Sequence, residues 1–268
     1  MRIPITVTIL GSRGSLPVSG AAYARYGGAT ISVLIEAAGQ ILLLDGGTGL
    51  LNLPPRNWNG QTLSLLFSHP HLDHMLGVPL CAPALTKGCT LNVYGVPRQG
   101  RTVREQLCAM MAPPLWPVGP DLLPADFSFH DLPPHLTLGT VTVDSMEGFH
   151  PGGSTVFRVS LSDTRVVLLT DCTVTAQNRD SLLDFCRDCD LLLCDGQYSD
   201  GEWPTRAAFG HNTWNEMARF GRDCGAKRTR ILHHDPTHTD QMLDAAQQEV
   251  QAICPTCTLA YDGEELTL

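Results

Sequence analysis

Short apolar segments of β-strand type recur along the whole chain, and this repetition limits the fold more than any other feature. Most are bounded by turn-forming residues, which is typical of buried strands. Helical patterns are fewer and lie between them. The segments are ITVTIL, TISVLIEA, QILLLDGG, LSLLFSH, TLNVYG, VTVDSM, TVFRVSL, RVVLLTD, DLLLCDG and RTRILHH. The chain is therefore predicted to be an α/β protein in which two β-sheets pack on each other and helices cover them.

Several of these segments end in a side chain that could bind a metal. Open α/β folds bind their ligands at the carboxyl ends of their strands, so neighbouring strands would bring these side chains together. The terminal residues are Asp45, His69, Asp171, Asp195 and His234. The pattern predicts a single active site along one edge of the sheets.

The densest group of polar side chains follows the apolar run LSLLF. The sequence SHPHLDH, residues 68–74, contains His69, His71, Asp73 and His74. A loop of solvated histidines is the alternative, but packing alone gives no reason to gather four potential ligands within six positions. Imidazole and carboxylate ligands suit zinc, and suit manganese or iron when oxygen ligands are numerous. The spacing indicates a metal site.

The charge balance limits the class of partner. The 268 residues carry 18 basic and 27 acidic side chains, a net charge of −9, and only two of the basic residues are lysines, Lys87 and Lys227. A protein that holds long nucleic acid by neutralising phosphates needs the opposite balance. A small anionic substrate, attracted by metal ions, is compatible with this charge.

The N-terminal sequence MRIPITVTIL is predicted to be the first strand rather than a signal peptide, because a glycine-rich turn follows it and no cleavage site of small residues is apparent. No apolar stretch approaches the roughly 20 residues that span a bilayer. We therefore expect a cytoplasmic protein without a membrane partner.

Two further features leave alternatives open. Ten cysteines include the pairs Cys186/Cys189 and Cys254/Cys257, for which unpaired reduced thiols are favoured over a structural zinc site. The proline-rich segment at about 95–139 is either a lid or substrate wall, or an ordinary surface excursion. A single domain is expected over residues 1–268.

Beyond SHPHLDH, the chain resembles the metallo-β-lactamase superfamily of binuclear metallohydrolases. The resemblance is to its phosphodiesterase-like branch, which includes phosphoribosyl cyclic phosphate phosphodiesterase and ribonuclease Z. It implies an αββα four-layer sandwich of two mixed β-sheets flanked by helices. The matching sequences cover nearly the whole chain in the family order: GSRGSLP, RYGGATISV, LLLDGGTG, SHPHLDH, HPGGSTVFRV, LLTDC, CDGQYSD, FGHNT and LHHDPTHTD.

By this resemblance the cofactors are two divalent metal ions, Zn²⁺ or Mn²⁺, with iron as a further option. One ion would be bound by His69, His71 and His150, and the other by Asp73, His74 and His234. Asp171 would bridge the ions, and Asp45 would orient ligands from behind. Of the adjacent His233 and His234, only one is expected to face the metals, and His234 is favoured because it matches the family position.

The resemblance also places His211, in FGHNT, near the substrate phosphate, where it would assist departure of the leaving group. A loop that caps the following helix is the alternative for this residue. His211 and Asp73 are the predicted catalytic residues, and a hydroxide that bridges the metals is the expected nucleophile.

The expected reaction is hydrolysis of a small phosphodiester, such as a cyclic nucleotide or a cyclic sugar phosphate. The alternatives are thioester or lactam hydrolysis on the same fold, tRNA 3′-processing, and a metal-binding sensor without activity. Net charge −9 and the absence of an obvious long arm make tRNA processing the weaker interpretation. Whether the chain forms a homodimer is left open by the sequence.

Overall fold

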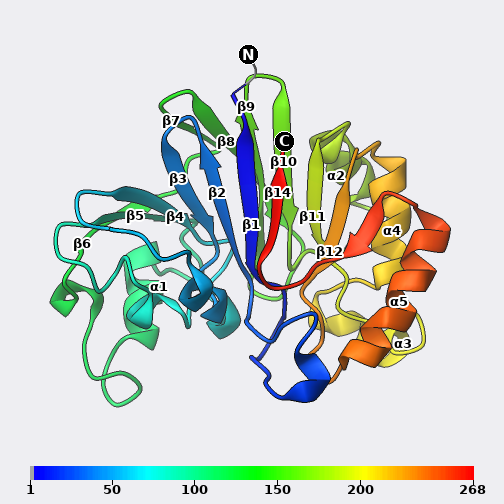
Figure 1. Ribbon diagram of the computed structural model, residues 1–268, viewed down its shortest axis with the longest axis horizontal. Helices are drawn as coiled ribbons and strands as arrows, with labels where there is room; N and C mark the ends of the chain where they lie inside the picture. The colour runs from blue at the N-terminus through cyan, green and yellow to red at the C-terminus, as the bar shows by residue number, and fades with distance from the viewer. Residues whose placement is uncertain (1–2) are drawn as a thin grey trace.

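The computed structural model describes residues 3–268 and shows two β-sheets packed face to face, with helices on the outer faces (Figure 1). The first sheet contains, in spatial order, β14 (Glu264–Thr267), β1 (Ile5–Gly11), β2 (Ser32–Ala37), β3 (Gln40–Leu44), β4 (Thr62–Leu66), β5 (Thr90–Gly95) and β6 (Asp126–Asp131). The second contains β13 (Cys257–Leu259), β12 (Thr229–Leu232), β11 (Leu191–Asp195), β10 (Thr164–Leu169), β9 (Ser154–Leu161), β8 (Val141–Gly148) and β7 (His135–Leu138). The predicted αββα sandwich is confirmed.

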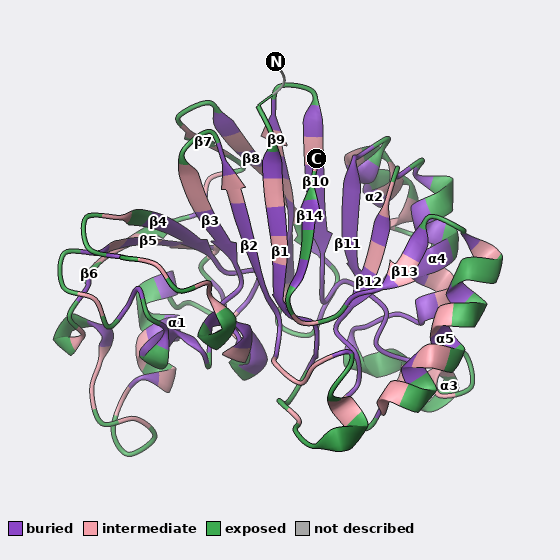
Figure 2. Ribbon diagram, viewed as in Figure 1, coloured by how far each residue is buried: buried purple, intermediate pink, exposed green. Residues whose placement is uncertain are grey.

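The main apolar core lies between the two sheets. Strand residues point alternately to opposite faces, so in β1 the side chains of Ile5, Val7 and Ile9 are fully buried while the residues between them are partly exposed. They belong to the same cluster as Val143 and Phe157 of the second sheet. Figure 2 shows the resulting buried bands on the strands.

Helices cover the outer face of each sheet. On the first sheet, α1 (Val103–Met110) begins with a capping box at Thr102 and Glu105 and buries Val103 and Leu107 against the sheet. The second sheet is covered by α2 (Arg179–Cys186), α4 (Trp214–Asp223) and α5 (Asp240–Ile253), and a short helix α3 (Trp203–Arg206) lies near them. Within residues 3–268, no helix combines the length and the apolarity needed to cross a bilayer.

Parallel pairing determines where the polar loops meet. Strands β3 to β6 are parallel to one another, and so are β10 to β13. The carboxyl ends of each set therefore lie at one edge of its sheet. The loop after β4, which includes the short helix η3 (Leu72–His74), and the loops after β10, β11 and β12 carry the polar residues described below.

The segment at 95–139 is largely part of the domain framework. Its helix α1 is packed on the first sheet, and β6 pairs in parallel with β5 at the sheet edge. α1 and β6 are therefore not an ordinary surface excursion. Leu115 and Leu122, in the connection between them, are exposed.

The cysteines differ from the expectation in one pair. Cys254 and Cys257 form a disulfide, whereas unpaired thiols were expected there, because the end of α5 and the start of β13 bring the two side chains together. Cys186 and Cys189 are free and buried. None of the groups of metal-capable side chains found within residues 3–268 includes a cysteine.

Candidate metal centre

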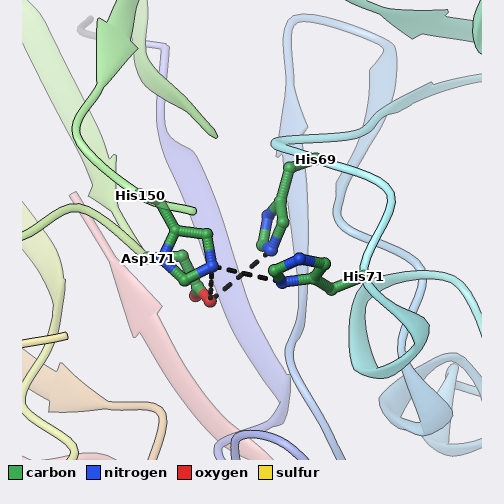
Figure 3. A group of neighbouring side chains, drawn as sticks. All are labelled: His69, His71, His150 and Asp171. Carbon is green, nitrogen blue, oxygen red and sulfur yellow. Dashed lines mark hydrogen bonds and ion pairs between the residues drawn. The ribbon is translucent and has the colours of Figure 1, made fainter. Parts of the chain in front are cut away.

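Four side chains from the ends of three strands meet at the edge of the sandwich. His69 and His71 follow β4, His150 follows β8 and Asp171 follows β10. Figure 3 shows the three imidazoles and the carboxylate pointing toward one another. His150 Nε2 lies 3.1 Å from His71 Nδ1, and the Nε2 atoms of His69 and His150 each lie 3.6 Å from Asp171 Oδ2. We call these four residues the open group, because His71 is exposed.

A second set of side chains meets at the other oxygen of the same carboxylate. His74 Nε2 and His233 Nε2 lie 3.3 Å and 3.2 Å from Asp171 Oδ1. Asp73 Oδ2 is 3.4 Å from His74 Nε2 and 3.2 Å from His233 Nε2. We call Asp73, His74, His233 and Asp171 the closed group, because all four are buried.

The donor set and its spacing fit metal ions in both groups. Ligands about 2.0–2.1 Å from a tetrahedral zinc ion lie about 3.3–3.4 Å from one another, which is close to the separations within each group. The Nε2 atoms of His69 and His74 are buried and have no hydrogen-bond partner within the described residues. Burying a polar atom without a partner is costly. The lone pairs of these two ring nitrogens therefore favour a cation between the side chains of their groups.

The structure corrects the choice between the two adjacent histidines. His233, not His234, joins the closed group. The ring of His234 lies on the other side of the backbone, where its Nε2 is 2.9 Å from the Ala260 carbonyl oxygen. His233 has left-handed backbone dihedral angles, with φ 66°, and this turn directs its ring rather than that of His234 to the cluster.

Asp45 lies behind the closed group at the end of β3. Its Oδ2 is 2.9 Å from His74 Nδ1. Ser68 donates to the same carboxylate twice, from its backbone N–H at 2.7 Å and from its hydroxyl at 2.8 Å. Asp45 therefore fixes the ring of His74 with Nε2 directed toward Asp171.

His211 lies beside both groups and is held by a carboxylate that the sequence did not pair with it. Its Nδ1 is 2.8 Å from Asp195 Oδ2 and 3.9 Å from Asp171 Oδ2. Its ring stacks on His233 with 4.9 Å between centroids. Asp195 was recognised only as a strand end with a potential ligand, and the sequence offered no sign of its contact with His211.

Charge and burial shift the pKa values of the closed group strongly. Burial would raise the pKa of Asp73, but the charge of His74 and the hydrogen bond and charge of His233 hold it well below its ordinary value. Burial opposes protonation of His233, yet the Asp171 charge and the hydrogen bond to Asp73 raise its pKa to about 9. The imidazoles and carboxylates of this group form ion pairs that a bound cation would replace.

In the open group, burial dominates. It lowers the pKa of His69 well below its ordinary value, and it also lowers the pKa values of His71 and His150, with the Asp171 charge acting in the opposite direction in all three. Neutral imidazole is the form that binds metals. The burial of these rings therefore favours the ligand form.

Two glycines make room for the rings. A Cβ on Gly14 would lie 2.1 Å from His233 Nδ1, and a Cβ on Gly210 would lie 2.3 Å from His150 Nδ1. Gly210 also has φ 95° and presents its carbonyl oxygen 3.0 Å from His150 Nδ1. Larger residues at these positions would displace the rings from the cluster.

Comparison with known protein families gives a match over most of the chain. Residues 25–234 match the family described as the beta-lactamase superfamily domain. Among curated proteins, the chain is 24% identical to ribonuclease Z of Methanosarcina acetivorans, over 98% of both sequences. It is 24% identical to ribonuclease Z of Myxococcus xanthus, over 85% of this chain and 89% of that protein.

Solved structures with the same fold include three that match nearly full length. The metallo-β-lactamase fold protein YhfI from Bacillus subtilis has a TM-score of 0.75 at 20% identity, covering 100% of both chains. A diphosphatase from the PhnP family has a TM-score of 0.71 at 18% identity, covering 100% of this chain and 98% of that one. The short form of human tRNase Z has a TM-score of 0.71 at 20% identity, covering 97% and 98%.

Proposed function

Since the chain belongs to the beta-lactamase superfamily and is a hydrolase of the metallo-β-lactamase fold, we propose that it hydrolyses a small phosphodiester with two divalent metal ions. A cyclic nucleotide or a cyclic sugar phosphate is the proposed substrate class. The observation that carries the proposal is the position of Asp171, whose two carboxylate oxygens each contact a different group of ligands. A single carboxylate shared in this way is suited to bridging two cations.

The proposed ligands are the seven residues of the open and closed groups. The chemistry supplied by bound Zn²⁺ or Mn²⁺ ions would be a lowered pKa for the attacking water and neutralisation of charge on the phosphoryl oxygens. The open group would present its exposed side to substrate. The residues are His69, His71, His150, Asp73, His74, His233 and Asp171.

The proposed general acid is His211. The carboxylate of Asp195 accepts a hydrogen bond from Nδ1 and so leaves Nε2 for the substrate. From there a protonated ring can donate to the departing oxygen. The loop also caps α4, because the Thr213 hydroxyl accepts from the Glu216 N–H at 3.2 Å. For His211 itself, the pairing with a buried carboxylate favours a role in proton transfer.

Asp73 is proposed to act as the base for the attacking water. Its Oδ2 accepts a hydrogen bond of 2.7 Å from the backbone N–H of Ser15 and is 3.2 Å from His233 Nε2. These contacts fix the carboxylate, which can hold the proton that the attacking water releases.

A substrate screen tests the proposal. Manganese- and zinc-loaded protein is assayed with bis(p-nitrophenyl) phosphate, cyclic nucleotides, cyclic sugar phosphates and a thioester. Hydrolysis of diesters alone supports the assignment. Turnover of the thioester without turnover of any diester would replace it.

His211→Ala then tests the role of the general acid. We expect both metals and the fold to be retained while kcat falls by about 10²- to 10⁴-fold for an alkoxide leaving group. The loss should be smaller for p-nitrophenolate, which needs little protonation. Equal losses for the two leaving groups would indicate phosphate binding, and loss of an ion would show that His211 is a ligand.

A second candidate is processing of tRNA 3′ ends, which is favoured by two relatives that carry the name ribonuclease Z and are matched over 98% and 89% of their lengths. The net charge of −9 disfavours a long polyanion as substrate. Cleavage of a tRNA precursor with higher kcat/KM than any small diester would support this candidate.

Eight free cysteines, most of them buried, favour a cytoplasmic location for either function.

A further inference from the structure

A small cavity of about 270 Å³ lies next to the open group and has His150 in its lining. Its walls come from the loop after β8, the loop after β10, and the short helix η6 (Ala207–Phe209) with the glycine that follows it. The Thr173 N–H donates to the Phe149 carbonyl oxygen at 2.9 Å, which joins the two loops. The Gly210 carbonyl oxygen lies 3.0 Å from His150 Nδ1. The other lining residues are Phe149, Pro151, Thr173, Ala207, Ala208 and Gly210, and none of these six can carry a charge.

Two phenylalanine side chains are exposed on the segments that form this cavity. Phe149 is 65% exposed, and Phe209, directly before the lining residue Gly210, is 56% exposed. The two segments are in close contact, because a Cβ on Gly210 would lie 2.4 Å from Pro151 Cδ. The backbone of Phe149 is also fixed, since its N–H donates to Cys172 Sγ at 3.3 Å. Neighbouring exposed aromatic rings beside a polar site are typical of a ligand-binding surface.

One polar side chain of the lining has an unused hydrogen-bonding group. Thr173 is only 6% exposed, and its Oγ1 is buried without a hydrogen-bond partner among residues 3–268. A buried hydroxyl without a partner costs free energy. A ligand in the cavity that offers a donor or an acceptor to this hydroxyl would recover that cost.

We propose that this cavity binds the nucleobase of the substrate, with the Phe149 ring as its stacking face and the Thr173 hydroxyl as its hydrogen-bond partner. The inference rests on the proposed function and narrows its substrate class to nucleotides. An exposed aromatic ring stacks on the face of any base, and a lining without lysine, arginine or carboxylate suits an uncharged ring rather than a phosphate. Because His150 belongs to both the cavity and the open group, a base held here has its sugar and phosphate next to the metal ligands.

Calorimetric titration of the metal-loaded protein with adenosine 5′-monophosphate and with ribose 5-phosphate tests the site, because the two ligands differ only in the base. For wild type we expect the nucleotide to have the lower Kd, by about 10- to 100-fold. Phe149→Ala should remove most of that ratio, and Phe149→Tyr should keep most of it, since the tyrosine ring still stacks. The matched control is Tyr261→Ala, which removes a 46% exposed aromatic ring from the turn between β13 and β14 and should keep the wild-type ratio. Equal Kd values for the two ligands in wild type, or an unchanged ratio in Phe149→Ala, would overturn the proposal.

A second pair of ligands separates a stacking site from an apolar site that accepts any shape. Phenyl phosphate and cyclohexyl phosphate have rings of the same number of atoms, but only the phenyl ring is planar. We expect wild type to bind phenyl phosphate more tightly and Phe149→Ala to bind the two equally. Equal or tighter binding of cyclohexyl phosphate by wild type would assign the cavity to an aliphatic group and would contradict the base site.

Thr173→Val tests the hydrogen bond to the base, because valine has nearly the same shape without the hydroxyl. We expect the Kd of adenosine 5′-monophosphate to rise about two- to tenfold and that of ribose 5-phosphate to stay at the wild-type value. The melting temperature of the variant should not fall, since the hydroxyl loses no partner within the described residues. An unchanged Kd for the nucleotide would overturn the role of Thr173.

Kinetics distinguishes failure of this site from failure of the proposed function. Adenosine 2′,3′-cyclic phosphate and methyl riboside 2,3-cyclic phosphate present the same scissile diester with and without a base, and we expect the first to have the higher kcat/KM in wild type but not in Phe149→Ala. Failure of the proposed function would appear as no diester hydrolysis with the Kd ratio and its dependence on Phe149 intact. Failure of the base site would appear as diester hydrolysis with equal kcat/KM for the two substrates.

Discussion

The open group contains three histidines and one carboxylate, whereas the closed group contains two histidines and two carboxylates, with Asp171 counted in both. The groups also differ in exposure, because His71 is exposed, while Asp73, His74 and His233 are buried. A divalent cation in the closed group would be neutralised by two nearby negative charges. Under the proposed function, we therefore expect the closed group to retain its ion and the open group to exchange ligands and receive substrate.

The largest effect is expected at the residue that the two groups share. Asp171→Asn should lower kcat for bis(p-nitrophenyl) phosphate by at least about 10³-fold, because an amide bridges cations poorly and removes one negative charge from each group. Thermal unfolding should change little, since the fold depends on the apolar strands. The exposed Asp163→Asn is the matched control. Turnover at the wild-type level would refute the bridging role.

The adjacent histidines sharpen the comparison next. His233→Ala should reduce the metal content from about two ions to about one and lower kcat by about 10²- to 10³-fold, since it removes a ligand of the closed group only. His234→Ala should keep both ions and destabilise the fold by about 1–3 kcal/mol, because the Ala260 carbonyl loses its partner. Metal analysis and denaturant unfolding measure both variants. The reverse pattern would restore His234 as the ligand.

A smaller effect is expected behind the closed group. Asp45→Asn should weaken metal affinity by about 10- to 100-fold for one ion and leave the other unchanged, because Asp45 contacts His74 and no ligand of the open group except through Ser68. Asp195→Asn provides the contrast, since it should keep both affinities and lower kcat through His211. Equal weakening of both ions in Asp45→Asn would show that the groups are not independent.

The smallest effect concerns the wild-type protein. Titration with a chelator should remove the ions in two steps separated by about tenfold in chelator concentration, with the ion of the open group leaving first. His71→Ala should show the second step alone. Removal of both ions at one midpoint would contradict the difference between the groups.

Much of this arrangement follows from local sequence. The ten apolar segments are all strands, and the HPHLDH spacing places its ligands on one loop because a buried strand leads directly into it. The four missed strands, β6, β7, β13 and β14, lie at sheet edges, and three of them have four residues or fewer, so they carry little apolar signal. Their partners, rather than their own sequence, make them strands.

Two features of the site depended on geometry that periodicity does not contain. His234 is favoured by its match to the family position at the end of β12, but the backbone at His233 is left-handed, with φ 66°, and it is the His233 ring that joins the cluster. The contact of Asp195 with His211 joins β11 to the loop before α4, and nothing local to either segment indicates it. Tertiary packing decides both.

The left-handed backbone at Asp45, Asp171 and His233, with φ of 60°, 49° and 66°, also has a consequence for engineering. A non-glycine residue in this region costs about 1 kcal/mol or more relative to glycine, although aspartate and histidine tolerate it better than most residues. At these three positions the left-handed backbone therefore costs conformational energy, and the side chains that impose this cost are those that catalysis needs. Selection of variants for heat resistance alone would accumulate glycine or asparagine at these positions, and the gain in melting temperature would come with loss of the reaction.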